Sequence, residues 1–221
     1  MITKEFQLIA TKVKEFLENE SSGHDFYHAE RVFNNAIYLQ DYEKGDSFVI
    51  GCAALLHDIC RPWEKKTGKS HFGDEALEII KDILVQTNTP NEKIVPILEV
   101  IKYHDIYDWS EKVVNKSIEL QIIQDADNLD AIGAIGIART FTFGGAHNCQ
   151  MYSPGENLEF NHDFVESPQV TTSTIAHFYE KLLKLKDHMN TKTAKQIAQK
   201  RHQFMEDFLQ QFFDEWNGKF N

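Results

Sequence analysis

Hydrophobic residues recur along most of the chain every three or four positions, which is the spacing of amphipathic helices. These stripes predict helices over about 6–17, 26–44, 47–58, 72–84, 91–103, 117–138, 172–188 and 193–216. The segments 61–70 and 143–169 lack this period and are expected to be loops. No alternating pattern is long enough to predict a sheet. The predicted fold class is therefore all-α.

The helix over 47–58 is the most apolar of the set, with Ser47 as its expected N-cap. It ends in two polar residues, His57 and Asp58. Burying a carboxylate costs several kcal/mol unless a cation or hydrogen bonds compensate it. Imidazole nitrogen and carboxylate oxygen form a common mixed ligand set for divalent metals. The pair therefore points to a metal site, provided that partners lie elsewhere in the chain.

Two further ionisable residues take core-facing helical positions where apolar residues are expected. His28 shares its stripe with Val32, and Asp127 lies among three carboxylates within 124–130. Carboxylates so close together repel unless a cation sits among them. Two imidazoles and two carboxylates leave coordination positions open for water and a substrate oxygen, as a hydrolytic metal site requires.

Composition and cysteine usage favour a globular protein of a reducing compartment. The 221 residues are 42% hydrophobic and 26% charged, and no apolar run has the length of a signal peptide core or a membrane span. Cys52, Cys60 and Cys149 show no CxxC spacing, so a disulfide framework is not expected. We expect a cytoplasmic protein without a membrane partner, built as a single domain over 1–221 with a core at about 20–190 and a C-terminal helical extension at about 191–221.

The formal net charge of −11 argues against a nucleic acid polymer as partner, because binding of such polymers rests on neutralising phosphates with lysine and arginine. If the protein handles phosphates, the positive charge must be local, supplied by a metal and a few basic side chains. A small, multiply charged substrate fits this charge better than a polymer.

The four candidate ligands form a recognisable pattern. His28 followed by Arg31-Val32, then His57-Asp58, then the distant Asp127 resembles the H…HD…D signature of the HD-domain metal-dependent phosphohydrolases. The segments 23–28, 54–59 and 125–139 are similar to a bacterial branch of small cytosolic HD proteins that includes nucleoside triphosphate pyrophosphohydrolases, over roughly residues 20–190. The resemblance implies an all-α bundle with a metal between helices.

Carried over to this chain, the resemblance makes His28, His57, Asp58 and Asp127 the metal ligands. The ligand types suit Mn²⁺, with Mg, Fe, Co and Ni as alternatives. The implied reaction is hydrolysis of a (deoxy)nucleoside triphosphate to monophosphate and pyrophosphate by metal-activated water. Alternatives are a nucleoside 5′-monophosphate phosphatase, a cyclic-nucleotide phosphodiesterase, or a non-catalytic nucleotide-binding module.

Further candidates surround this core set. Asp58 and Asp130 are expected to act on the attacking water, or Asp130 bonds to a ligand histidine instead. Arg31 is expected to contact a substrate phosphate, with pairing to Glu30 or Asp25 as the alternative. Three lysines of the basic segment 61–70 are expected to steady the polyphosphate, against the alternative of ordinary solvated side chains: Lys65, Lys66 and Lys69.

The remaining histidines and aromatic residues receive weaker assignments. His71 is expected to bind substrate and His104 to take part in catalysis; a second metal ion at these two histidines is the alternative. His24 is expected to fix the turn before the second helix. An aromatic stripe over 204–216 is expected to pack in the core, with a homodimer surface as the alternative.

Overall fold

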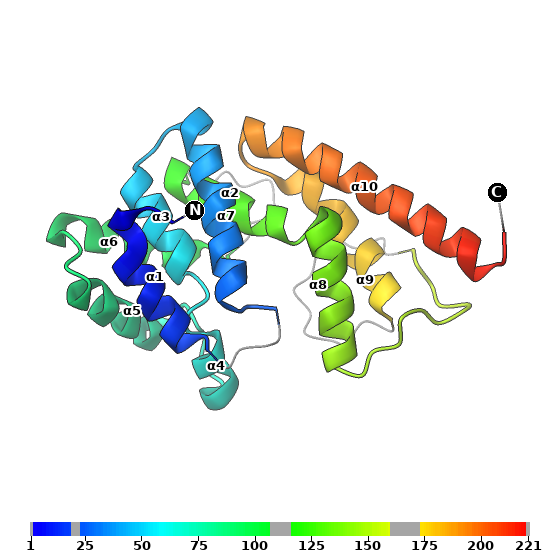
Figure 1. Ribbon diagram of the computed structural model, residues 1–221, viewed down its shortest axis with the longest axis horizontal. Helices are drawn as coiled ribbons and strands as arrows, with labels where there is room; N and C mark the ends of the chain where they lie inside the picture. Colours follow the sequence, from blue (N-terminus) through cyan, green and yellow to red (C-terminus); the bar gives the residue numbers. More distant parts are fainter. Residues whose placement is uncertain (1, 19–22, 107–115, 160–172, 220–221) are drawn as a thin grey trace. The chain divides into compact units, whose positions relative to one another are not determined.

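The computed structural model describes residues 2–18, 23–106, 116–159 and 173–219 (Figure 1). Within these ranges the secondary structure is helical and no strand forms, apart from an isolated β-bridge between Gln150 and Ser173. The all-α prediction is confirmed. The chain divides into two compact units, Met1–Asp127 and Asn128–Asn221, and the division falls inside one helix. The expected single domain with a C-terminal extension stays a prediction.

The first unit contains a short 3₁₀ turn and six complete helices among its described residues. In chain order these are η1 (Lys4–Phe6), α1 (Gln7–Phe16), α2 (Phe26–Glu43), α3 (Ser47–Leu56), α4 (Arg61–Thr67), α5 (Asp74–Gln86) and α6 (Asn91–Tyr103). Helix α7 (Ile118–Asp130) begins in this unit and ends in the second.

Helix α3 forms the centre of the first unit. Every residue from Val49 to Leu56 is buried, so the helix is apolar on all sides, as a core helix must be. It packs against α1, α2 and α6, and α5 packs in turn against α6. Its N-terminus is capped by Asp46, whose Oδ1 accepts hydrogen bonds from the backbone N–H groups of Phe48 and Val49. The cap therefore lies one residue before the predicted Ser47.

Segment 61–70 differs from its prediction, because its first part is helical. Helix α4 begins at Arg61 with a proline in its first turn, and Gly68 in the left-handed conformation (φ +71°) ends it. Proline at the first helical positions and glycine just past the last one are ordinary helix boundaries. No residue of α4 is buried, so the apolar stripe that would have predicted this helix is missing.

The second unit is built around its last helix. After the end of α7 come α8 (Gly133–Ala146), α9 (Thr174–Glu180), η2 (Leu182–His188) and α10 (Lys192–Trp216). Helix α10 packs against α8 and η2, and α9 packs against both α8 and η2. Thr191 caps α10 by accepting a hydrogen bond from the N–H of Ala194.

The helix predicted over 117–138 is broken in two. Gly133 has φ +76°, a conformation that ends α7 and starts α8 in a new direction. A Cβ at Gly133 would lie 3.0 Å from the Cβ and Cγ of Arg201 on α10. The small residue at this position therefore lets α10 approach closely.

The aromatic stripe near the C-terminus is only partly in the core. Phe208 packs against Phe178 with ring centroids 5.9 Å apart, and Leu209 is buried. Phe204 and Trp216 are exposed, and the predicted alternative of a homodimer surface stays a prediction. Among the residues that the structure describes, no helix combines the length and the apolar character needed to cross a bilayer.

Candidate metal centre

Three helices, α2, α3 and α7, bring the predicted ligands together. His57 is the C-cap of α3 and Asp58 follows it, so the buried central helix ends at the site. His28 lies in the first turn of α2, where Asp25 caps the helix by accepting a hydrogen bond from the His28 N–H at 2.9 Å. Asp127 lies on α7. The structure brings these side chains from separate helices together, and their role as metal ligands stays a prediction.

Two histidines and two carboxylates face one another at distances that suit shared ligation. His28 Nε2 lies 3.5 Å from Asp127 Oδ1 and 3.6 Å from Asp58 Oδ2. His57 Nε2 lies 3.7 Å from Asp58 Oδ2 and 4.0 Å from Asp127 Oδ1. Ligand atoms about 2.1 Å from one ion are separated from each other by about 3–4 Å. Each of the two histidines therefore lies at a ligand–ligand spacing from both carboxylates.

The histidine tautomers support this assignment. His57 Nδ1 donates to the carbonyl of Ala54 at 2.9 Å, which leaves the lone pair on Nε2. That Nε2 atom is buried and makes no hydrogen bond within the described part of the chain. Burial lowers the pKa of His57 to about 4, although Asp58 and Asp127 oppose the shift. A neutral imidazole with a buried, inward-pointing lone pair fits a metal ion.

Asp58 faces a second set of histidines with its other oxygen. Asp58 Oδ1 lies 3.4 Å from His71 Nε2 and 3.7 Å from His104 Nε2. His71 Nδ1 is bonded to Glu64 Oε2 at 3.0 Å, and His104 Nδ1 to the carbonyl of Ile101 at 2.6 Å. Asp58, His71 and His104 place donor atoms within 4.8 Å of one another. The cluster is thus larger than the four predicted ligands.

Neighbouring side chains, Arg61 first among them, keep Asp58 ionised in spite of its burial. Burial raises the pKa of this carboxyl, but Arg61, His57 and His24 hold the pKa well below its usual range. The Nε of Arg61 lies 3.0 Å from Asp58 Oδ1. Arg61 was not among the predicted site residues. Burial opposes protonation of His104, yet the hydrogen-bonding and charge effects of Asp58 and Asp105 raise its pKa.

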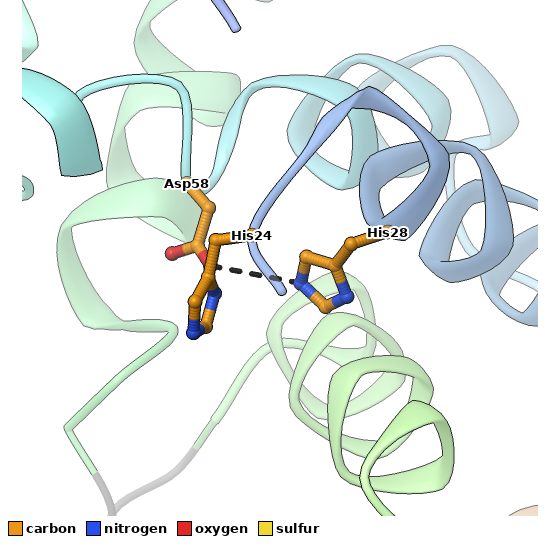
Figure 2. A group of neighbouring side chains, drawn as sticks. All are labelled: His24, His28 and Asp58. Carbon is orange, nitrogen blue, oxygen red and sulfur yellow. Dashed lines mark hydrogen bonds and ion pairs between the residues drawn. The ribbon is translucent and has the colours of Figure 1, made fainter. Parts of the chain in front are cut away.

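His24 is the second site residue that sequence reasoning missed. Figure 2 shows the imidazoles of His24 and His28 pointing toward the carboxylate of Asp58. His24 Nδ1 lies 2.6 Å from Asp58 Oδ2, the oxygen that also faces His28 and His57. His24 was expected only to fix the turn before α2, and its contact with Asp58 was not predicted.

The weaker candidates are placed as follows. Arg31 lies on α2 one turn after His28 and is half-buried. Lys65 and Lys66 are exposed on α4. Lys69 is exposed and bonds to both carboxylate oxygens of Glu75 at 2.6 Å, so its charge is already paired. Their roles in substrate binding stay predictions.

Asp130 belongs to the second unit and is buried there. Its Oδ2 accepts a hydrogen bond of 2.8 Å from Arg139. This pairing accounts for a buried carboxylate without a metal, and the predicted part of Asp130 in catalysis stays a prediction.

Comparison with known proteins agrees with this geometry. The family model of the HD domain matches residues 25–132, the range that carries all four predicted ligands. The Bacillus subtilis (strain 168) protein YpgQ is 35% identical over 208 residues, covering 94% of this chain and 92% of the relative.

Two solved structures, one of a further relative and one of YpgQ itself, agree with this match. A crystal structure of an HD-superfamily hydrolase from Bacillus thuringiensis is 40% identical, with a TM-score of 0.72, covering 97% of this chain and 99% of that one. A crystal structure of Bacillus subtilis YpgQ in complex with ADP is 32% identical, with a TM-score of 0.66, covering 93% of this chain and 97% of that one.

The helical fold and the His/Asp cluster define a hydrolase of the metal-dependent phosphohydrolase class. The chain belongs to the HD-domain family, and within it to the group of small bacterial proteins that includes YpgQ and the Bacillus thuringiensis hydrolase. HD domains bind divalent metal ions, and the donor set described above fits such an ion.

Proposed function

We propose that this hydrolase cleaves (deoxy)nucleoside triphosphates between the α and β phosphates, giving a monophosphate and pyrophosphate. The observation that carries the proposal is the cluster in which the buried His28 and His57 and the half-buried Asp127 place ligand atoms within 4.8 Å of one another, beside Asp58. A nucleotide as ligand is supported by the YpgQ relative, whose crystal structure contains ADP.

We propose His28, His57, Asp58 and Asp127 as the ligands of one divalent ion, Mn²⁺ first and Mg, Fe, Co or Ni as alternatives. Such an ion, when bound, activates water for attack on phosphorus and offsets the charge of the phosphate oxygens. The protein prepares the site by burying neutral His57 and by keeping Asp58 ionised through Arg61. The half-buried Arg31, on the same helix as His28, is the proposed contact for a substrate phosphate.

Because the net charge of the protein is −11, a polyphosphate is repelled unless a cation bound at the site offsets its charge. The same charge disfavours nucleic acid polymers as substrates. We propose a cytoplasmic enzyme acting on free nucleotides.

The test is a nucleotide screen on protein that has been stripped of metal by chelation and reloaded with Mn²⁺, Co²⁺ or Ni²⁺. Phosphate is detected with and without added pyrophosphatase. Phosphate that appears only with pyrophosphatase indicates pyrophosphate release and supports the proposal. Phosphate released from nucleoside monophosphates without pyrophosphatase would indicate the phosphatase alternative, and turnover of cyclic nucleotides the phosphodiesterase alternative.

The rival from another class is a nucleotide-binding module without catalysis. It predicts nucleotide binding but no turnover with any of these metals. Turnover by the wild type excludes this rival. In the enzyme, Asp58→Ala should abolish metal retention and hydrolysis while circular dichroism still shows the helical fold. Full activity in Asp58→Ala would refute the metal assignment.

A further inference from the structure

The carboxylate of Asp58 is shared between two groups of side chains that lie on its two sides. Oδ2 faces His24, His28 and His57. The other oxygen, Oδ1, faces a different set: Arg61, His71 and His104. The first set belongs to the metal centre proposed above. The second set contains its own cation, and its function is not explained by that centre.

On the Oδ1 side, Arg61 is held by three carboxylates. Its Nε lies 3.0 Å from Asp58 Oδ1, one terminal nitrogen lies 3.1 Å from Asp105 Oδ2, and the other lies 3.4 Å from Glu64 Oε2. Planar guanidinium groups offer five donors in a fixed fork, which suits several carboxylates at once. Burial disfavours the charged form of Arg61, but Asp58 and Asp105 raise its pKa, so it remains a cation.

The Oδ1 side of Asp58 also contains two histidines that are suited to bind a metal ion. His71 and His104 are 1% exposed, and their Nε2 atoms make no hydrogen bond among the described residues. Both point to Asp58 Oδ1, and the three donor atoms lie within 4.8 Å of one another. The Nδ1 atoms of both histidines are bonded to oxygens, which puts the lone pair on Nε2. Buried polar atoms normally have a partner, so two buried Nε2 lone pairs beside a carboxylate oxygen are suited to bind a cation.

Arg61 and a second metal ion would compete for the same negative charge. Asp58 Oδ1 and Asp105 Oδ2 are both within hydrogen-bond distance of the guanidinium, and Asp105 Oδ2 also lies 3.8 Å from His71 Nε2. A divalent ion between Asp58, His71 and His104 would stand next to a fixed positive charge in a largely buried site, where charges are weakly screened. The arginine cannot relieve this repulsion by losing its proton.

We propose that Arg61 takes the place of a second metal ion, so that the protein binds one divalent ion and gains a second site at Asp58, His71 and His104 when the charge of Arg61 is removed. The expected count of one ion in the wild type rests on the metal centre that is proposed above. It assigns Arg61 as a positioning residue that holds Asp58, Glu64 and Asp105 in place of a metal.

The experiment counts metal ions in four forms of the full chain. Metal-free wild type, Arg61→Gln, Arg61→Lys and the double variant Arg61→Gln/His71→Ala are titrated with Mn²⁺ alone in a calorimeter, and the bound metal is also measured by elemental analysis after gel filtration. Arg61→Lys is the matched control, because it keeps the charge at the same position. Electron paramagnetic resonance distinguishes an isolated Mn²⁺ ion from two ions coupled through a shared carboxylate.

We expect one equivalent of Mn²⁺ in wild type and in Arg61→Lys, and two in Arg61→Gln with a spectrum of coupled ions. The double variant should return to one equivalent. If circular dichroism shows that Arg61→Gln is unfolded, Arg61→Met, which keeps an apolar stem, replaces it with the same expected count.

Three results would overturn the inference. Two equivalents in wild type would show that Arg61 does not exclude a second ion. One equivalent in folded Arg61→Gln and Arg61→Met would show that the histidines do not form a site, while the proposed metal centre would stand. No binding in any form would refute both the inference and the metal centre.

Discussion

His24 Nδ1 lies 2.6 Å from Oδ2 of Asp58, the oxygen that faces His28 and His57. Hydrogen bonds from outer partners orient ligating carboxylates and histidines, and their loss usually lowers metal affinity about 10- to 100-fold. His24 is about one third exposed, with 31% of its side chain accessible, whereas Asp58 is buried. The contact therefore joins the metal centre to the segment that precedes α2.

The first prediction concerns this contact. His24→Ala should weaken Mn²⁺ binding about 10- to 100-fold, because Asp58 loses a partner that fixes its orientation. His24→Asn, whose amide can replace the Nδ1–H donor, should retain most of the affinity. Calorimetric titration of both variants, with His147→Ala as an exposed histidine control, measures the difference. Equal affinity in His24→Ala and wild type would contradict a supporting role.

The second prediction tests Asp127. Asp127→Asn removes a charge from a side chain that is 26% exposed, so the fold should tolerate it, but Mn²⁺ affinity should fall by more than about 100-fold. Asp41→Asn on the exposed side of α2 is the matched control and should bind Mn²⁺ normally. Thermal unfolding without metal should be the same in both variants and wild type. Adding Mn²⁺ should raise the melting temperature of wild type and the control alone.

The third prediction follows from the pKa of His57, which burial lowers to about 4. An unfolded histidine titrates near 6.5, so the unfolded chain binds one more proton than the folded one between these values. The contribution of neutral His57 to stability is complete above pH 6.5 and is lost as pH falls toward 4, by up to roughly 3 kcal/mol.

Urea unfolding of metal-free wild type and His57→Gln checks this pH dependence, since glutamine does not titrate. The difference in unfolding free energy between wild type and variant should fall as pH drops from 7 to 4.5. A difference that stays constant over this range would mean that His57 has an ordinary pKa in the folded protein.

The fourth prediction concerns the break between α7 and α8. Gly133→Ala places a Cβ in a left-handed conformation (φ +76°) and 3.0 Å from the side chain of Arg201, so it should cost at least about 1–2 kcal/mol of stability. Gly145→Ala in the same helix meets nothing within 4 Å and should be neutral or stabilise by up to about 1 kcal/mol. Chemical unfolding of both variants measures the contrast, and equal effects would contradict it.

The sequence predicts the helices and the four central side chains because each rests on a local signal. Apolar stripes indicate the helices, and His28, His57, Asp58 and Asp127 stand out as polar residues at apolar positions. The same logic fails for helix α4, which buries no residue and so has no stripe. Its proline in the first turn and Gly68 after the last are the signals that could have predicted it.

Arg61 and His24 were missed for a different reason. His24 contacts Asp58, 34 residues away along the chain, and Arg61 contacts Asp105, 44 residues away, in addition to Asp58, which precedes it by three residues. An arginine in a basic segment and a histidine in a turn are common surface residues, and Asp58 three residues before Arg61 is the one local signal that could have indicated the Arg61 contact. Only the packing of α2, α3, α4 and α6 shows that they share one carboxylate.

The central helix α3 and the turn between α3 and α4 carry natural chemical reporters, Cys52 on the helix and Cys60 in the turn. Cys52 and Cys60 are at most 1% exposed, and burial raises the pKa of the Cys60 thiol to about 12. Neither thiol can react with a labelling reagent until the packing around α3 opens, whereas the half-buried Cys149 gives a reference for ordinary access. The labelling rate of these two cysteines therefore measures how often the ligand-bearing end of α3 opens, without any engineered probe.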